Sequence, residues 1–306
     1  MDKPWEGVLK LGIVHFMAFP ETIKGEGPIL ETVTKIAEDD FFAEVEVTWM
    51  KDAGVRRKVR EVLETAHLTV GYGAQPPLLI GKLDLNALDE RERGRAVAQV
   101  KACIDEAVEL GAGRVAVLSG PDPGEADRAK AVECLIRSLK ELCAYGREKG
   151  IGITLEIFDR TVDKRCLVGP AVEAVAIAEG VRADYEDFGL MYDLSHLPLL
   201  GERPVEALGA IKEHLVHIHI GNCVMRDPNH PAYGDQHPRF GIPGGENDVP
   251  QLVEFLRALF EVGYLVERPM GELPIVAFEV KPLPGESSEL VIANAKRVWR
   301  EAWARV

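Results

Sequence analysis

Four residues in the second half of the chain have side chains that can bind divalent metal ions, and each ends a short apolar run. They are Glu156, Asp193, His219 and Glu279. One such residue alone is more often a solvated group or an ion-pair partner, but the repetition over four successive runs favours a shared site. Three carboxylates brought together would repel one another unless a cation lay among them. Oxygen-rich ligation favours Mn²⁺ first, then Mg²⁺ or Co²⁺, with Zn²⁺ also compatible, so we expect one divalent metal.

Short β-branched runs and longer amphipathic stretches alternate along the whole chain. The predicted strands are residues 9–15, 43–49, 68–72, 114–118, 152–156, 189–193, 215–219 and 274–279. The predicted helices are residues 95–110, 125–149, 170–178, 204–211, 249–262 and 288–304, with apolar residues three or four apart.

Eight strands, each followed by a helical segment, over 306 residues predict the α/β class and a (β/α)8 TIM barrel. A doubly wound sheet is disfavoured because no Gly-x-Gly-x-x-Gly follows the first strand. No linker or shift in composition divides the chain, so we expect a single domain over residues 1–306. In a TIM barrel the carboxyl ends of the strands meet at one mouth, where active sites lie.

The connection from His219 to Val249 is much longer than the usual loop of about 2–6 residues in α/β units. It is rich in Gly, Pro, His and Asp and carries Arg226, Asp235 and His237. Long loops in compact domains are usually functional or disordered. We therefore predict a lid loop after the seventh strand.

The charge balance restricts the partners of the protein. The chain has 36 basic and 50 acidic residues, a net charge of −14, which disfavours binding to nucleic acid and to anionic membranes. The first ten residues lack the apolar stretch of a signal peptide, and no run of about 18 apolar residues occurs. Five cysteines without a Cys-x-x-Cys pair indicate reduced thiols. We expect a cytoplasmic enzyme with a small-molecule substrate, and homo-oligomerisation is left open.

Four motifs together resemble the xylose-isomerase-like TIM-barrel superfamily: Leu155-Glu156, Asp193-Leu-Ser-His196, His217-Ile-His219 and Phe278-Glu279. Its members include sugar epimerases, hydroxypyruvate isomerases, inosose dehydratases and endonuclease IV-type AP endonucleases. The resemblance implies that Glu156, Asp193, His219 and Glu279 hold the metal and that His196 lies beside the substrate. It also implies that the two glutamates act as acid and base on opposite faces of the substrate. The implied activity is that of an isomerase or epimerase of a carbonyl sugar or related polyol, through α-proton abstraction and an enediolate.

Two other activities remain open. A lyase or dehydratase of the same superfamily, resembling inosose dehydratase or a subunit that cleaves C-glycosides of 3-oxo-sugars, would abstract the same proton. An endonuclease IV-like AP endonuclease is the second, because Asp235-Gln-His237 resembles the pattern that joins His196 in holding a further zinc. Residues 71–75 and 118–121, however, lack the histidines of that family. We therefore favour a hydrogen-bonded lid in which His237 contacts substrate over a second metal at His196, Asp235 and His237.

Three further residues are predicted substrate contacts, each with an ordinary alternative. His15, at the end of the first predicted strand, contacts a sugar hydroxyl or fills the top of the barrel. Trp49 stacks on a sugar or packs in the core. Arg226 resembles the arginine that epimerases direct at substrate oxygens, and its alternative is a solvated surface residue. Glu46, on the same run as Trp49, receives no predicted role.

Overall fold

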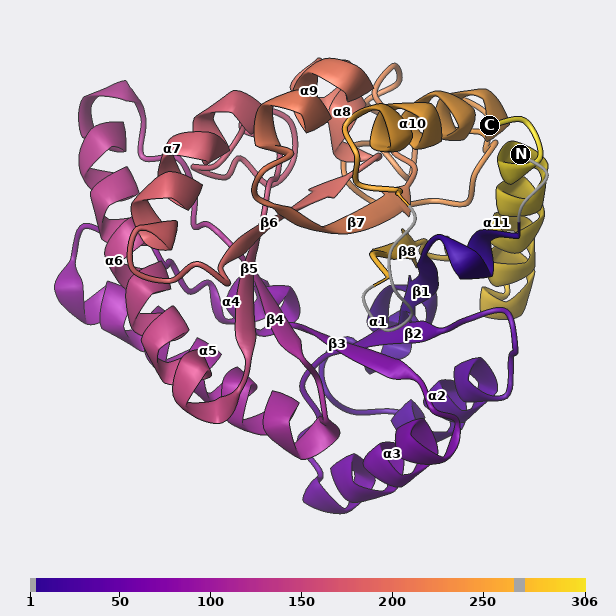
Figure 1. Cartoon of the computed structure of the whole chain (residues 1–306), viewed down its shortest axis with the longest axis horizontal. Helices are drawn as coiled ribbons and strands as arrows, with labels where there is room; N and C mark the ends of the chain where they lie inside the picture. The colour runs from indigo at the N-terminus through magenta and orange to yellow at the C-terminus, as the bar shows by residue number, and fades with distance from the viewer. Residues whose placement is uncertain (1–3, 267–272) are drawn as a thin grey trace.

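The computed structural model describes residues 4–266 and 273–306, and these form a closed barrel of eight parallel strands in sequence order. The strands are β1 Lys10–Val14, β2 Glu44–Val47, β3 Thr69–Gly73, β4 Arg114–Leu118, β5 Gly152–Glu156, β6 Gly189–Asp193, β7 Leu215–Gly221 and β8 Ile275–Glu279. The barrel closes where the first strand lies beside the last, with Lys10 opposite Ile275 (Figure 1). The predicted (β/α)8 TIM barrel with a single domain is confirmed.

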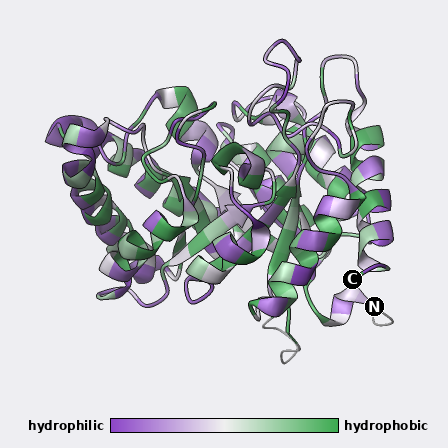
Figure 2. Ribbon diagram, turned by 90° about the horizontal axis from the view of Figure 1, so that it is seen from above, coloured by the Kyte–Doolittle hydropathy of each residue, from purple (hydrophilic) through white to green (hydrophobic). Residues whose placement is uncertain are grey.

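The helices surround the barrel as an outer ring (Figure 1). They are α1 His15–Ala18, α2 Ile29–Ala37, α3 Ala53–Thr65, α4 Gln75–Gly81, α5 Glu90–Leu110, α6 Glu125–Lys149, α7 Ala171–Arg182, α8 His196–Leu200, α9 Pro204–Ile211, α10 Val249–Glu261 and α11 Ser288–Trp303, with short 3₁₀ turns at Trp5–Gly7 and Pro20–Thr22. Green apolar and purple polar positions alternate around the outer helices in Figure 2, as expected for helices that bury one face. In the described part of the chain, no helix combines the length and apolar composition needed to cross a membrane.

Several predicted boundaries agree with the structure and others do not. The bounds of β4, β5, β6, α6 and α9 are as predicted, whereas α2, α3, α4 and α8 lie where no helix was predicted. The seventh strand was predicted to end at His219, but β7 continues to Gly221, because Gly221 still pairs with Glu279 of β8. The first strand was predicted to include His15, but β1 ends at Val14 and His15 begins α1.

Part of the barrel interior is polar, although branched aliphatic side chains dominate most TIM-barrel interiors. Glu46 of β2 contacts His217 and His219 of β7. Because β2 and β7 are not neighbours in the sheet, these contacts cross the inside of the barrel. Gly71 provides the room, since a Cβ atom there would lie 2.7 Å from Glu46 Cγ.

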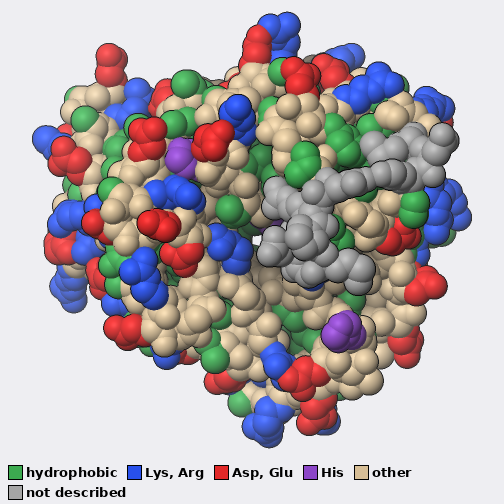
Figure 3. Space-filling view, viewed as in Figure 1, with side chains coloured by type: hydrophobic (Ala, Val, Ile, Leu, Met, Phe, Trp, Pro, Cys, Tyr) green, Lys and Arg blue, Asp and Glu red, His purple; other side chains and the backbone are tan. Residues whose placement is uncertain are grey.

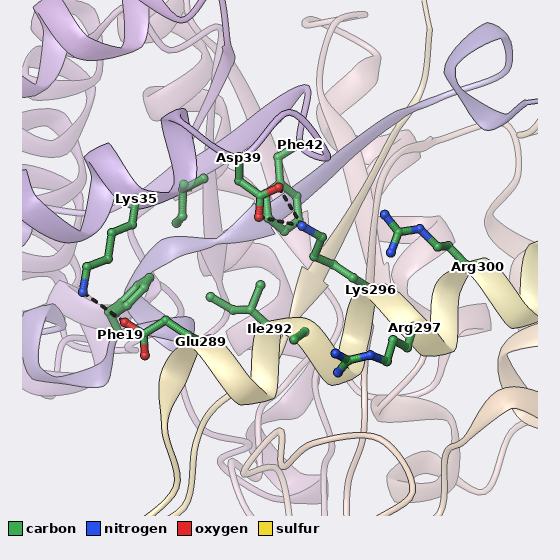
Figure 4. Close-up of a pocket in the computed structure, with 11 residues that line it drawn as sticks. Phe19, Lys35, Asp39, Phe42, Glu289, Ile292, Lys296, Arg297 and Arg300 are labelled. Carbon is green, nitrogen blue, oxygen red and sulfur yellow. Dashed lines mark hydrogen bonds and ion pairs between the residues drawn. The ribbon is translucent and has the colours of Figure 1, made fainter.

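Two ion pairs connect the last helix, α11, to α2 and the loop that follows it, across a cleft of about 270 Å³ (Figure 4). Lys35 of α2 lies 3.0 Å from Glu289 of α11. Lys296 of α11 lies 2.6 Å from Asp39, in the loop between α2 and β2. These contacts connect the last helix to an early part of the chain on the outside of the barrel, near the place where β1 pairs with β8.

Trp299 of α11 is the largest side chain buried in this region. It is fully buried and packs against Phe278 of β8, Trp303 and Trp5, with ring centroids 6.1, 5.5 and 6.2 Å away. Its neighbour Phe278 directly precedes Glu279, so the packing of α11 fixes the strand that presents this glutamate.

We predict that Trp299→Ala lowers the free energy of unfolding by about 3–5 kcal/mol, because it leaves a cavity that the packed rings cannot fill. The measurement is urea unfolding followed by circular dichroism. Leu290→Ala on the same helix, where the side chain is 70% exposed, is the matched control and should change stability by less than about 0.5 kcal/mol. Equal effects of the two substitutions would contradict the assigned role of α11.

Candidate metal centre

The four residues singled out at the strand ends converge inside the mouth of the barrel. Glu156 ends β5, Asp193 ends β6, His219 lies two residues before the end of β7, and Glu279 ends β8. One ligand atom of each lies within 4.8 Å of the others. His219 Nδ1 is 2.7 Å from Glu279 Oε2 and 3.5 Å from Glu156 Oε1. The parallel register of the barrel therefore brings together side chains that are up to 123 positions apart in sequence (156 to 279).

Each of the four residues also leaves one buried atom without a hydrogen bond. Within the described residues, these atoms are Glu156 Oε1, Asp193 Oδ2, His219 Nδ1 and Glu279 Oε2. These atoms contact one another or His237 only as ion pairs, at 2.7 to 3.6 Å, and none of them makes a hydrogen bond within the described residues. Buried polar atoms without hydrogen bonds are costly, and four that converge on one point favour a shared ligand. Three carboxylates and one imidazole form a donor set suited to a divalent ion. The residues present therefore fit a metal.

Neighbouring groups hold the outer atoms of the carboxylates. Gln75, the first residue of α4, donates from Nε2 to Glu156 Oε2 at 2.7 Å. The backbone N–H of Ser195 donates to Asp193 Oδ1 at 2.6 Å. One oxygen of each of these two carboxylates is thus fixed by the protein while the other faces the shared centre. Outer contacts of this kind orient metal-binding side chains.

The pKa values of the cluster show how burial and neighbouring charges act on its side chains. Burial raises the pKa of Asp193 to about 6, against the attraction of His196 and His237. Burial would likewise raise the pKa of Glu279, but His237 and His219 outweigh it and lower that pKa to about 2. His219 is held protonated because Glu46 and Glu279 outweigh its burial and raise its pKa well above the usual value. Positive charge on the imidazoles offsets the negative charge of the carboxylates here.

A second cluster lies beside the first, where the lid loop meets α8. Asp235 Oδ1 is 3.2 Å from His196 Nε2 and 2.9 Å from His237 Nε2. Burial lowers the pKa of both imidazoles, but the Asp235 carboxylate outweighs it and raises the pKa of His196 to about 10 and that of His237 to about 9. The structure therefore brings together the three residues predicted to be either a second metal site or a hydrogen-bonded lid.

Lys164 adds a positive charge to this second cluster. Its Nζ lies 3.0 Å from Asp235 Oδ2 and 3.3 Å from Asp163 Oδ2. Burial would lower the pKa of Lys164, but Asp235 and Asp163 raise it above its usual value. The charge of Asp235 is thus balanced by an ammonium group. Both Asp235 carboxylate oxygens and His196 Nε2, however, make no hydrogen bond within the described residues, and Asp193, His196 and His237 offer ligand atoms within 4.8 Å of one another. The hydrogen-bonded lid therefore stays a prediction, beside the second metal site.

Polar contacts hold the lid against the barrel, and one lid residue, His237, has a strained backbone conformation. Lys281 N–H, just past β8, donates to the carbonyl oxygen of His237 at 2.6 Å. His237 itself adopts a φ of +50°, a left-handed conformation that is uncommon for a residue with a side chain. This conformation directs the imidazole inward, with Nε2 3.5 Å from Glu279 Oε1. Strain of this kind is typical of functional positions.

A cavity of about 190 Å³ opens onto the metal centre. One wall is apolar: Phe16, Met17, Ile23, Leu79, Ile80 and Phe158. The other is polar and carries Gln75, Lys164, Gln236, His237 and Lys281 beside Glu156, His219 and Glu279. The volume lies below the range of about 300–1,000 Å³ typical of drug-sized ligands. It suits a small molecule that carries several polar groups.

Three predicted substrate contacts lie outside this cavity. His15 Nε2 pairs with Thr32 Oγ1 of α2 at 2.7 Å, because His15 starts a helix rather than ending a strand. Trp49 Nε1 donates to the carbonyl oxygen of Ile23 at 2.9 Å. The Arg226 side chain is 80% exposed and pairs with Glu246. Arg226 thus matches its ordinary alternative, a solvated surface residue. Trp49 is only half-buried, and His15 is buried against α2, so contact of these two residues with substrate stays a prediction.

Gln75, Lys164 and Glu46 are site residues for which the sequence indicated no role. Gln75 lies in the segment noted only for lacking histidines, and Lys164 is the second member of an Asp-Lys pair on a loop. Their partners, Glu156 and Asp235, are far away in sequence, so only the closed barrel reveals these contacts. Lys281, two residues after Glu279, is indicated by the alternation of a strand, which puts both side chains on one face, and it lines the cavity with Glu279.

Comparisons with known proteins agree with this architecture. The IOLI protein with a bound zinc atom has a similar structure, with a TM-score of 0.73 and 17% identity over 97% of this chain and 99% of that one. A D-tagatose 3-epimerase-like protein has a TM-score of 0.71 and 18% identity over 97% and 99% of the two chains. An AP endonuclease, family 2, from Brucella melitensis has a TM-score of 0.67 and 19% identity over 94% and 98%. At these identities the likeness shows the fold alone, and a search of curated protein sequences finds no match.

A family model covers most of the chain. The model for the Xylose isomerase-like TIM barrel matches residues 37–286, a range that includes all four converging residues and the lid. With the closed barrel and the ligand cluster at its mouth, this match places the chain in the Xylose isomerase-like TIM barrel family.

Proposed function

We propose that this protein is a divalent-metal-dependent isomerase or epimerase of a carbonyl sugar or related polyol. The observation that carries the proposal is the convergence, within 4.8 Å, of one ligand atom each from Glu156, Asp193, His219 and Glu279, none of which makes a hydrogen bond within the described residues. Two of the atoms are on glutamates that flank His219 from β5 and β8. Structural neighbours named as a D-tagatose 3-epimerase-like protein and an L-ribulose 3-epimerase add support at the level of the fold.

A bound divalent ion supplies a Lewis acid that withdraws electron density from the substrate's carbonyl and hydroxyl oxygens, which acidifies the proton on the carbon between them. We expect Mn²⁺ in this role. Glu156 and Glu279 would then exchange that proton: one carboxylate removes it from one face, and the other returns a proton to the opposite face. Gln75 holds Glu156 in place through its 2.7 Å hydrogen bond.

The second cluster protects the reacting carbon from water and positions the oxygens. An enediolate exposed to water is lost to side reactions, and loop closure is the usual protection. His237 and Lys281 line the cavity, and the backbone contact between them holds the lid down. His196, whose Nδ1 donates to the carbonyl oxygen of Ile157 at 2.7 Å, is fixed in orientation. We assign His237, which lines the cavity, to orienting substrate oxygens. His196 is fully buried and faces Asp235 with its Nε2, so it supports the lid rather than lining the cavity.

A lyase is the second candidate, because His237 lies close enough to the catalytic Glu279 to protonate a departing group. The endonuclease alternative is weaker. The net charge is −14, and acidic and basic side chains are interspersed on the face shown in Figure 3. Salt-sensitive binding and cleavage of duplex DNA with an abasic site would instead support the endonuclease.

We predict that Glu156→Gln, Asp193→Asn, His219→Ala and Glu279→Gln each lower the metal content and abolish turnover while the barrel stays folded. Each substitution removes one ligand of the ion and, for the glutamates, a proton-transfer group. Metal analysis and circular dichroism of the purified variants provide the measurement. Glu246→Gln, a lid carboxylate outside the cavity, is the control and should retain metal. Stoichiometric metal in three of the four variants would contradict the assigned site.

His237→Ala distinguishes the isomerase from the lyase. If His237 only positions and shields, turnover should fall modestly, and exchange of the α-proton with deuterated solvent should continue. If it protonates a leaving group, product formation should fall by more than about 10³-fold with exchange preserved, since general acid assistance contributes about 10²–10⁴-fold. We predict the first result. Exchange and product formation are followed by NMR and mass spectrometry on ketoses and 3-oxo-glucosides, with His230→Ala on the same lid as control.

A further inference from the structure

One buried carboxylate inside the barrel contacts two imidazoles at once. Glu46 Oε1 lies 2.7 Å from His219 Nε2 and 2.8 Å from His217 Nε2. All three side chains are buried, with 2%, 2% and 6% of Glu46, His219 and His217 exposed. Nothing in the proposed mechanism uses Glu46. Its contact with His219, however, lies on the side of that ring opposite the metal centre.

The two nitrogens of His219 face different partners. Nδ1 points toward Glu279 and Glu156, and Nε2 points toward Glu46. A neutral imidazole carries one N–H, and the nitrogen that binds a metal must be without a proton. If Nδ1 is the ligand, the proton of the ring must therefore be on Nε2. Glu46 is the acceptor placed to receive it.

The same argument disfavours a second cation held by Glu46, His217 and His219. His219 would then have to give up its last proton and bridge two cations as an imidazolate, a costly form of the ring that the Glu46 carboxylate beside Nε2 does not favour. His217 instead completes the hydrogen bonding of Glu46, since its Nε2 donates to the same carboxylate oxygen. Two N–H donors offset the cost of burying this carboxylate.

The sequence around Glu46 makes room for it. Gly71 lies opposite Glu46 in the β2–β3 register, and a Cβ atom there would lie 2.7 Å from Glu46 Cγ. Gly71 has no left-handed φ, so space rather than backbone conformation accounts for this glycine. The absence of a side chain at Gly71 thus leaves space for the side chain of Glu46.

We propose that Glu46 is a positioning residue of the metal centre: it fixes the His219 ring with the proton on Nε2 and leaves Nδ1 free for the metal. The inference rests on the proposed metal site. Carboxylate partners of this kind orient a metal-binding histidine and increase its basicity, and their loss lowers metal affinity by about 10–100-fold. His217 contributes by holding Glu46.

The test compares Glu46→Leu and Glu46→Gln with Glu44→Gln. Glu44 lies on the same strand and is also buried. Burial and the charge of Glu46 raise the pKa of Glu44 well above its usual value, so Glu44→Gln replaces one uncharged side chain by another of the same size. We expect Glu46→Leu to weaken Zn²⁺ binding by about 10–100-fold in a chelator competition. Glu46→Gln, which keeps one acceptor oxygen, should lose less, and Glu44→Gln should stay within about threefold of the original chain.

A second readout follows the proton itself. In ¹⁵N-histidine NMR of the Zn²⁺-loaded protein, His219 should show a hydrogen on Nε2 and none on Nδ1. Glu46→Gln should shift that Nε2–H signal, and Glu44→Gln should leave it in place. Because the glutamine variant conserves size, it keeps the test valid if Glu46→Leu does not fold.

The outcomes separate the two proposals. A starting protein that binds no divalent metal contradicts the proposed function and, with it, the role of Glu46. A protein that binds metal, with affinity and His219 signals unchanged in both Glu46 variants, contradicts the positioning role alone. Two metal ions per chain, one of them lost in Glu46→Leu, would also overturn it in favour of a second cation site.

Discussion

The mutual repulsion of three buried carboxylates governs the functional end of this barrel. Glu156, Asp193 and Glu279 come from three strands. Each places one oxygen that makes no hydrogen bond in the described residues into the same small space. No packing force brings like charges together in the interior, and each costs free energy there. A divalent cation would resolve the repulsion, and the proposed function rests on this step. Gln75 anchors Glu156 from outside the cluster, and the imidazole of His219 completes the set of candidate ligands.

The barrel provides the rigidity that such an arrangement requires. Adjacent parallel strands place Asp193 beside His219 and Gly221 beside Glu279, so the register of β6, β7 and β8 sets the ligand geometry. Below the ligands, the interior is shaped for polar groups, with Gly71 opening space for Glu46. Above them, the lid is attached by Lys281 and Lys164. The site is therefore held from three directions, and the metal ligands themselves need not move.

The sequence predicted those parts of the site that depend on local patterns, and it missed those that depend on contacts across the barrel. An apolar run that ends in a carboxylate is visible in sequence, so the bounds of β5 and β6, with Glu156 and Asp193 at their ends, were predicted. Contacts across the barrel are not visible, because Glu46 and His219 meet only through closure of the sheet. Arg226 shows the opposite failure: its position after β7 resembled that of a substrate-binding arginine, but the fold of the lid turns it to solvent.

The central claim is that one divalent ion binds among the four strand-end residues. Anomalous X-ray scattering from crystals soaked in Mn²⁺ tests it most directly, because it locates the ion without reference to activity. The account predicts one strong peak per chain within about 2.0–2.3 Å of ligand atoms of Glu156, Asp193, His219 and Glu279. A lattice that admits Mn²⁺ but shows no peak there, or its strongest peak between Glu46 and His217, would contradict it.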